Sequence, residues 1–159
     1  MMSRLPIAPQ AQLDESAEAL QIATAIMGFE PNSLKMMAHR PAILNGFLGM
    51  AGPILGPDAL LDPGLRQLIA HVVSAVAGCH YCQAHTAHGA HNRGVDETKI
   101  ENVWSYETSD LFTDAERAAL ALAQAAGAVP NAASDAHFGE VRKYFSDAEI
   151  TEIVAVVSG

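Results

Sequence analysis

The sequence predicts an all-α fold, organised as a single-domain helical bundle. Apolar residues recur at helical spacing, as at Ala19, Ile22, Ala23 and Ile26. Signals for helix starts and helix ends follow one another at short intervals, and no segment shows the alternation typical of a strand. Of the 159 residues, 50% are hydrophobic, which is enough for one buried core. We therefore expect one domain over residues 1–159.

The first helix is expected from about Glu15 to Met27. Asp14 precedes it as a candidate amino-terminal cap. Gly28 follows it where a left-handed residue commonly ends a helix.

The next two helices are bounded by prolines. A helix capped by Asn32 should end near His39, because Arg40 precedes Pro41 and is pushed out of helical angles. Pro41 is suited to the first position of the following helix. The segment 52–58 contains two prolines and two glycines, which predicts a loop.

The strongest start signal is Asp62 followed by Pro63, a capping residue and a proline at the first helical position. It predicts a helix over residues 63–77. Gly78 should interrupt this helix, and a second helix should cover residues 79–93.

Four later helices each begin at a polar residue that can cap the amino end, namely Asp96, Thr113, Ser134 and Ser146. The first should end near Trp104 and the third near Phe145. Thr113 with Glu116, and Ser146 with Glu149, have the spacing of capping boxes.

Charge and hydropathy exclude several classes of protein. Lys and Arg number 9 against 18 Asp and Glu, and a net charge of −9 disfavours binding to nucleic acid. No apolar run reaches membrane-spanning length, and the start of the chain has no apolar signal region. We therefore expect a cytoplasmic protein that binds neither nucleic acid nor a membrane.

The chemistry concentrates around the two cysteines, Cys79 and Cys82, with His85 close by. Two cysteines separated by two residues can form a disulfide within one helical turn, and a thiolate near a helix amino end is stabilised by backbone N–H groups. A thiolate that attacks a peroxide becomes a sulfenic acid, which a second thiol converts to a disulfide. A nearby histidine can take the thiol proton. This arrangement predicts a thiol peroxidase or a dithiol oxidoreductase.

Three other uses of the pair are weaker. A thioredoxin-type motif needs a βαβ setting, whereas the flanks here are helical. A c-type haem needs histidine directly after the second cysteine, but residue 83 is Gln. Zinc is disfavoured because Cys79, Cys82, His85, His88 and His91 recur every three residues and rotate by roughly −60° per step on a helix, so the five cannot converge. We predict no metal, and surface positions for His88 and His91.

The residues 61–94 resemble the alkylhydroperoxidase D / carboxymuconolactone decarboxylase superfamily, in its peroxidase-related branch with a CxxC motif. The helix followed by Gly-Cys-x-Tyr-Cys and a histidine carries most of the likeness, and weaker likeness continues over residues 112–120 and 149–157. The resemblance implies a helical fold of the alkylhydroperoxidase D type and a homo-oligomer, a trimer or a hexamer. It also implies that Cys82 attacks the peroxide and that Cys79 resolves the intermediate.

Two departures from the family pattern concern proton transfer. The family relay begins with a glutamate twelve residues before the first cysteine, a position that is Gln67 here. His71 lies one turn further on the same face and is the nearest replacement. The relay histidine of the family would stand at Thr86, whereas this sequence has His85. We expect His85, together with His71, to deprotonate Cys82, and Gln67 to orient a water or a histidine by hydrogen bonds.

The resulting hypothesis is a peroxidase-like oxidoreductase that reduces a small hydroperoxide. A separate dithiol donor would regenerate the cysteine pair, without haem or flavin. Two alternatives stay open. The same scaffold could carry a lyase or isomerase for a lactone-like acid, with histidines as the acid and base. It could also be a non-enzymatic redox sensor whose disulfide changes an oligomer interface.

Overall fold

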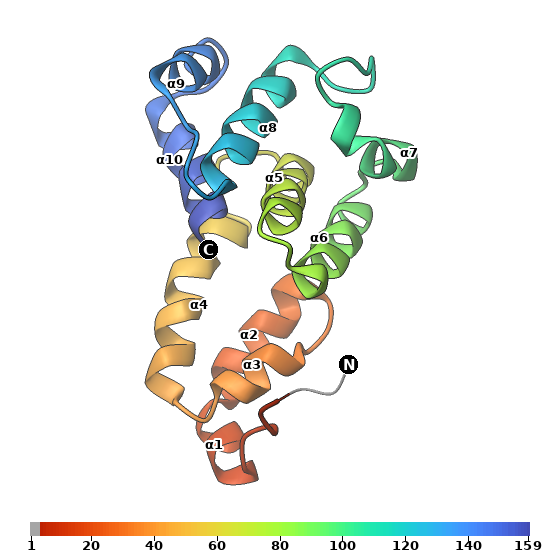
Figure 1. Ribbon diagram of the computed structural model, residues 1–159. Helices are drawn as coiled ribbons and strands as arrows, with labels where there is room; N and C mark the ends of the chain where they lie inside the picture. The colour runs from red at the N-terminus through yellow and green to blue at the C-terminus, as the bar shows by residue number, and fades with distance from the viewer. Residues whose placement is uncertain (1–3) are drawn as a thin grey trace. The chain divides into compact units, whose positions relative to one another are not determined.

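The computed structural model describes residues 4–159, and all regular structure within them is helical (Figure 1). The all-α prediction is confirmed. Contacts divide the chain into two compact units, one ending at Asp58 and the other running from Ala59 to Gly159. The expectation of a single domain stays a prediction.

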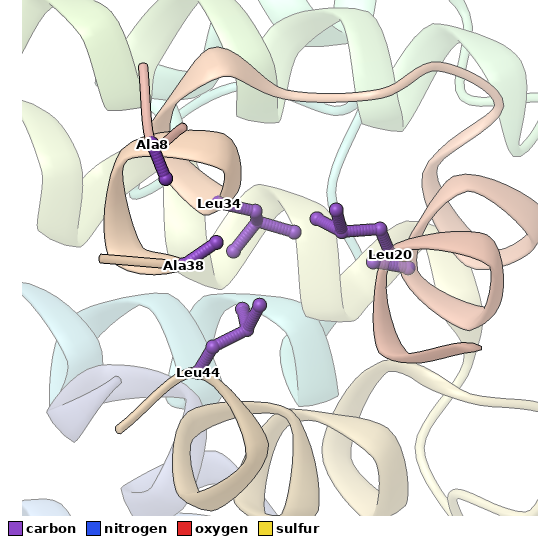
Figure 2. Packing of buried hydrophobic residues seen from close by; sticks show 6 residues of the cluster. Ala8, Leu20, Leu34, Ala38 and Leu44 are labelled. Atoms are coloured by element: carbon purple, nitrogen blue, oxygen red, sulfur yellow. The ribbon is translucent and has the colours of Figure 1, made fainter. Parts of the chain in front are cut away.

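The first unit contains four helices, α1 (Gln10–Glu15), α2 (Ala17–Met27), α3 (Asn32–Met37) and α4 (Pro41–Leu55). Small and aliphatic side chains from α2, α3 and α4 point toward one another and toward Ala8 (Figure 2). The buried members of this cluster are Ala8, Leu20, Ala23, Leu34, Ala38 and Leu44. Burial of these side chains is what holds the short helices of this unit together.

The amino-terminal helix prediction is wrong at its start. The chain is already helical from Gln10, and a break at Ser16 separates α1 from α2. Asp14 lies inside α1, where its carboxylate accepts a hydrogen bond from Gln10 Nε2 at 2.8 Å, so it does not cap α2. The predicted end is confirmed, because Gly28 follows α2 with a left-handed φ of 80°.

The next two helices differ from prediction at their ends. Pro31 occupies the cap position of α3 and Asn32 is its first residue. The helix α4 starts at Pro41 as predicted but continues through Pro53 to Leu55. A proline this close to the carboxyl end costs one hydrogen bond, and its exposed ring leaves the unpaired carbonyl open to water. The predicted loop therefore begins only at Gly56.

The second unit follows the predicted order of elements more closely. Its elements are α5 (Pro63–Val76), α6 (His80–Asn92), α7 (Glu97–Glu101), the 3-10 turn η1 (Val103–Ser105), α8 (Asp114–Gly127), α9 (Asp135–Val141) and α10 (Asp147–Ser158). The helix expected to end near Trp104 is thus divided into α7 and η1. The helix α9 stops at Val141 because the following residues close shorter turns, with Tyr144 N donating to Val141 O at 3.0 Å.

Helix α5 is the central element of this unit and packs against α6, α8 and α10. Its start is held by two carboxylates. Asp62 Oδ1 accepts a hydrogen bond from Leu65 N at 2.9 Å, which confirms the predicted cap. Glu152 of α10 accepts from Leu60 N at 2.7 Å and from Leu61 N at 3.0 Å. The approach to α5 is therefore anchored to the last helix.

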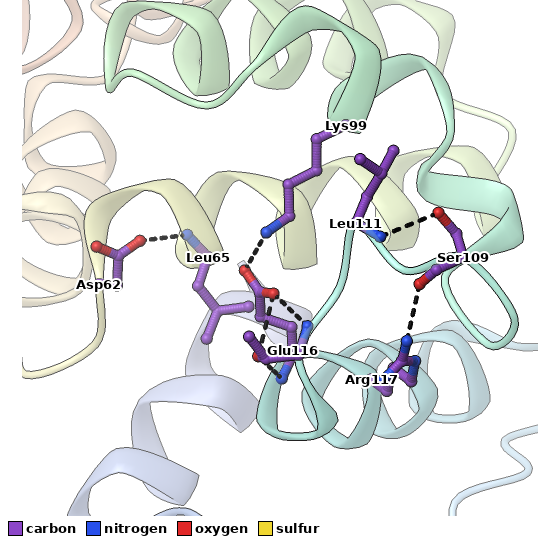
Figure 3. A network of polar contacts seen from close by, with 8 residues as sticks. Asp62, Leu65, Lys99, Ser109, Leu111, Glu116 and Arg117 are labelled. Carbon is purple, nitrogen blue, oxygen red and sulfur yellow. Dashed lines mark hydrogen bonds and ion pairs between the residues drawn. The ribbon is translucent and has the colours of Figure 1, made fainter.

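Polar contacts also fix the start of α8 (Figure 3). Thr113 and Glu116 form the predicted capping box, and Lys99 Nζ of α7 lies 2.6 Å from Glu116 Oε1. Burial raises the pKa of the Glu116 carboxyl, but hydrogen bonds from Lys99 and Thr113 outweigh it and hold this pKa below its usual value. The second predicted capping box, at the start of α10, is also present.

The segment between η1 and α8 is tied down by Arg117. Its guanidinium donates to Ser109 O at 2.8 Å and to Tyr106 O at 3.1 Å. Tyr106 is buried and its hydroxyl contacts Gln124 Oε1 at 2.8 Å. Together these bonds hold the turn that carries Trp104.

Candidate active site

The two cysteines lie where α5 turns into α6. Gly78 has a φ of 68°, a conformation that residues with a Cβ atom rarely adopt. Cys79 N donates to Ser74 O at 2.8 Å, which ties the turn back to α5. The helix α6 then begins at His80. The predicted interruption at Gly78 is confirmed, and it places Cys79 at the amino end of α6.

Cys79 and Cys82 form a disulfide, with 2.05 Å between the sulfur atoms and 5.3 Å between the Cα atoms. Both residues are partly buried. Cys79 is the capping residue of α6, and its Sγ accepts a hydrogen bond from Cys82 N at 3.2 Å. In the reduced protein, the free N–H groups and the dipole of α6 stabilise a thiolate at Cys79. Cys79 is therefore a favourable leaving group when a reductant attacks Cys82.

His71 reaches α6 from α5. Its Nδ1 lies 2.9 Å from Thr86 Oγ1, and Thr86 is one turn beyond Cys82 on the same helix. Burial lowers the pKa of His71 below its ordinary value of 6.5, and a hydrogen bond to the Gln83 backbone carbonyl offsets part of this shift. His71 is therefore neutral at neutral pH and has one ring nitrogen that can accept a proton.

His85 is the second neutral histidine near the pair. Burial is the main cause of its lowered pKa, and His88 adds to the effect. Its ring packs on Tyr81, with 4.1 Å between ring centroids. Tyr81 is 50% exposed, so this contact between the two rings lies at the surface. The assignment of His85 as the base for Cys82 stays a prediction.

Gln67 lies further from the cysteines than His71. Its side chain is buried against Gly89, where an added Cβ would lie 2.9 Å from Gln67 Cδ. Gly89 is seven residues beyond Cys82, about 10 Å along the helix axis. The amide of Gln67 thus packs on the middle of α6, and the structure brings His71, rather than Gln67, to the turn that contains Cys82.

Trp104 was not among the site residues predicted from the sequence. The Trp104 ring lies 5.7 Å from the His71 ring, measured between centroids, although the two residues are far apart in the chain. Trp104 is 52% exposed. The histidine ring is therefore in contact with an aromatic ring that is itself open to solvent. The only signal in the sequence was that the single tryptophan follows a capped helix.

Two other histidines of α6 conform to the sequence prediction. His88 and His91 are exposed on its surface. Among residues 4–159, no group of three His, Cys, Asp or Glu side chains is arranged to hold a metal ion.

Within the same described part of the chain, the helices are all too short or too polar to cross a membrane.

A helical unit with a cysteine pair at the start of one helix and neutral histidines beside it defines a dithiol–disulfide protein. The chain belongs to the carboxymuconolactone decarboxylase family, whose model matches residues 41–125. The matched part contains α5, α6 and both cysteines. The resemblance stated from the sequence is thereby confirmed.

One relative is the uncharacterized protein YnjA of Escherichia coli K12. It is 30% identical over 97 residues, which are 61% of this chain and 53% of the relative. The match thus spans about half the length of that protein.

Solved structures similar to this chain include the debrominase Bmp8. An alanine-for-cysteine variant of Bmp8 in complex with 2,3,4-tribromopyrrole has a TM-score of 0.88 at 28% identity, over 99% of this chain and 84% of that one. An uncharacterized peroxidase-related protein from Silicibacter sp. TM1040 has a TM-score of 0.82 at 25% identity, over 98% and 82%. An alkylhydroperoxidase D core from Ralstonia eutropha JMP134 has a TM-score of 0.83 at 24% identity, over 99% and 84%, and supports the fold.

Proposed function

We propose that this protein is a dithiol peroxidase that reduces small hydroperoxides through Cys82 and Cys79. The observation that carries the proposal is the Cys79–Cys82 disulfide at the amino end of α6, one turn from the contact between His71 and Thr86. A disulfide in this position is the oxidised product that such a reaction leaves behind. The similarity to a peroxidase-related structure from Silicibacter supports the same class.

The reaction has three balanced steps. The Cys82 thiolate attacks the terminal oxygen of the hydroperoxide, the O–O bond breaks, and the products are a sulfenic acid on Cys82 and an alkoxide that takes up a proton. The Cys79 thiol then attacks the sulfenic sulfur and releases water, which forms the disulfide. An external dithiol finally reduces the disulfide and is itself oxidised.

The histidines supply the proton acceptor that the first step needs. His71 and His85 are both neutral at neutral pH because burial lowers their pKa values, so either can receive the thiol proton. The amide of Gln67 cannot act as a base. The carboxylate step of the family relay is thus absent, and the proton moves directly to a histidine.

A single-turnover experiment tests the proposal. The reduced protein, freed of reductant, receives one equivalent of cumene hydroperoxide, and peroxide loss is followed together with intact mass. We expect peroxide loss and a decrease of two hydrogen masses as the disulfide forms. In Cys79→Ser the reaction should stop at a sulfenic acid on Cys82, which dimedone traps. If Cys82→Ser consumes peroxide as fast as the parent protein, the proposal is wrong.

Reductive dehalogenation is a second candidate, favoured by the similarity to Bmp8 over 99% of this chain. In this reaction an aryl bromide and two thiols give the arene, the disulfide and hydrogen bromide. The exposed rings of Tyr81 and Trp104 beside the two histidines offer flat surfaces for an aromatic substrate. Release of bromide from 2,3,4-tribromopyrrole by the reduced protein, at a rate above that of peroxide reduction, selects this candidate.

The same proposal includes the electron donor, the cofactors, the cellular location and the assembly of the protein. A dithiol protein or small dithiol serves as the electron donor, no haem or flavin takes part, and the protein works in the cytoplasm. It assembles as a homo-oligomer, a trimer or a hexamer. Exposed apolar side chains such as Leu60 and Val154 support an interface between copies. Sedimentation of the oxidised and the reduced protein measures the assembly and also detects a redox-dependent oligomer.

A further inference from the structure

The hydroxyl of Thr86 has three polar neighbours but only one hydrogen. Its Oγ1 lies 2.9 Å from Cys82 O, 3.1 Å from Gln83 O and 2.9 Å from His71 Nδ1. Each of the two carbonyls can only accept a hydrogen bond, and the Thr86 hydroxyl has the geometry of a donor to both, which favours a hydrogen directed away from His71. With the Thr86 hydrogen on a carbonyl, the Thr86 oxygen accepts the contact with His71, and the hydrogen of that contact is on Nδ1.

This arrangement of hydrogen bonds favours one tautomer of His71. A neutral imidazole carries one N–H, so a hydrogen on Nδ1 leaves the lone pair on Nε2. The Gln83 carbonyl beside the Thr86 hydroxyl does not oppose this assignment, because it also only accepts. The basic atom of His71 is therefore Nε2, and Nδ1 is the anchored atom.

We propose that Thr86 is a positioning residue, which holds His71 as the Nδ1–H tautomer so that Nε2 receives the proton of the Cys82 thiol. The base role of His71 rests on the proposed function, whereas the tautomer does not. Thr86 lies on α6, one turn beyond Cys82, so its hydroxyl holds the His71 ring of α5 against the helix that follows the cysteine turn.

The proton balance of this step is simple. Cys82 gives its proton to His71 Nε2, the electron pair stays on sulfur, and the ring becomes an imidazolium. The imidazolium keeps its hydrogen on Nδ1, so the bond to Thr86 persists and becomes stronger because the donor is now charged. The proton on Nε2 is then available for the alkoxide that leaves when the O–O bond breaks. No rotation of the ring is needed between the two transfers.

Substitutions of Thr86 distinguish the effect of its hydroxyl on the orientation of His71 from the effect of its side-chain packing. Thr86→Val keeps the shape but removes the hydroxyl, and Thr86→Ser restores the hydroxyl. Thr151→Val is the matched control, because Thr151 also donates to the carbonyl four residues back, at 2.8 Å, on the exposed face of α10. The readout is the long-range proton–nitrogen correlation spectrum of reduced, nitrogen-15-labelled protein, in which His71 is assigned by its loss in His71→Gln.

We expect the parent protein, Thr86→Ser and Thr151→Val to show a protonated Nδ1 and an unprotonated Nε2. In Thr86→Val the population should move toward the Nε2–H tautomer. An Nε2–H tautomer in the parent protein, or unchanged populations in Thr86→Val, overturns the proposal. This measurement uses no substrate, so its result is independent of whether the protein reduces peroxides.

A rate measurement tests the consequence for the thiol. In a Cys79→Ser background, alkylation of Cys82 by iodoacetamide near neutral pH should slow about 10-fold in Thr86→Val, less than the roughly 100-fold or more that loss of a general base costs. Thr86→Ser should recover the parent rate and Thr151→Val should keep it. If Thr86→Val reacts at the parent rate although its tautomer has shifted, His71 is not the base and the proposal fails at that step. A slower thiol in a protein that reduces no peroxide would support the positioning role and exclude the peroxidase.

Discussion

The two units of the chain are stabilised in different ways. In the first unit, none of the four helices has a side-chain hydrogen bond at its amino-terminal cap, and aliphatic contacts around Leu44 hold it together. In the second unit, side chains of Asp62, Cys79, Asp96, Thr113 and Ser146 accept backbone hydrogen bonds at helix starts. The unit that carries the cysteine pair thus has helix starts fixed by local polar bonds, and one of those caps is itself a member of the disulfide.

The largest effect is expected from core truncation in either unit. Leu44 and Leu120 are both fully buried, so Leu44→Ala and Leu120→Ala should each lower the free energy of unfolding by about 3 kcal/mol. Hydrogen exchange measured by mass spectrometry shows where protection is lost. Leu44→Ala should affect residues up to 58 and Leu120→Ala residues from 59 onward. Equal loss of protection in both units after either substitution would contradict the division into two units.

Alanine substitutions at two glycines should change the free energy of unfolding in opposite directions. An added Cβ at Gly89 meets the side chain of Gln67, so Gly89→Ala should destabilise the second unit by about 1–3 kcal/mol through overpacking. At Gly46 in α4 nothing lies within 4 Å, so Gly46→Ala should stabilise the first unit by up to about 1 kcal/mol through helix propensity. Urea unfolding measures both. The packing of Gln67 on α6 is refuted if Gly89→Ala is as stable as Gly46→Ala.

Substitution of two aspartates tests whether a side-chain cap at a helix start contributes more to stability than a hydrogen bond within a helix. Asp62→Ala removes the cap of α5 and should cost about 1 kcal/mol. Asp14→Ala removes one exposed hydrogen bond within α1 and should cost only about 0.3 kcal/mol. Thermal and urea unfolding of the two variants give the difference. Similar costs for both would show that capping does not distinguish the units.

The smallest effect concerns the pH dependence of the site. Trp104→Ala removes an aromatic neighbour of His71 and gives its ring more solvent, so the pKa of His71 should rise back toward 6.5. The neutral form of His71 exists above this pKa, so the acid limb of the rate of Cys82 alkylation should move to higher pH. An unchanged acid limb in Trp104→Ala would show that the tryptophan does not set this pKa.

The stability of the parent protein depends on the same group. At pH values between the lowered pKa of His71 and 6.5, the unfolded chain binds more protons than the folded one, so stability is lost as the pH falls through that range.

The difference between the units also explains what could be predicted from the sequence. Caps such as Asp62 and Thr113 act within one turn, so a short stretch of sequence contains the whole signal. The break at Ser16 and the passage of α4 through Pro53 depend on packing and solvent exposure, which no local pattern records.

The same distinction holds at the site. The cysteine pair and the turn at Gly78 were predictable because their residues are adjacent in the chain. The relation of His71 to Thr86 joins two helices, and that of His71 to Trp104 joins a helix and a later turn, so both required the fold. The packing of Gln67 against Gly89, instead of beside the cysteines, likewise depends on how α5 lies on α6.

The bonds from Leu60 and Leu61 to Glu152 connect positions about ninety residues apart. During synthesis the residues of α6 are made before Glu152, which follows 60 residues after the end of that helix. The support for the start of α5 is therefore completed only when α10 emerges, and until then the nascent chain carries two thiols on an unfinished scaffold. The two cysteines are thus synthesised before the helix that supports the start of α5. A chain that ended before α10 would expose these cysteines to oxidants without that support.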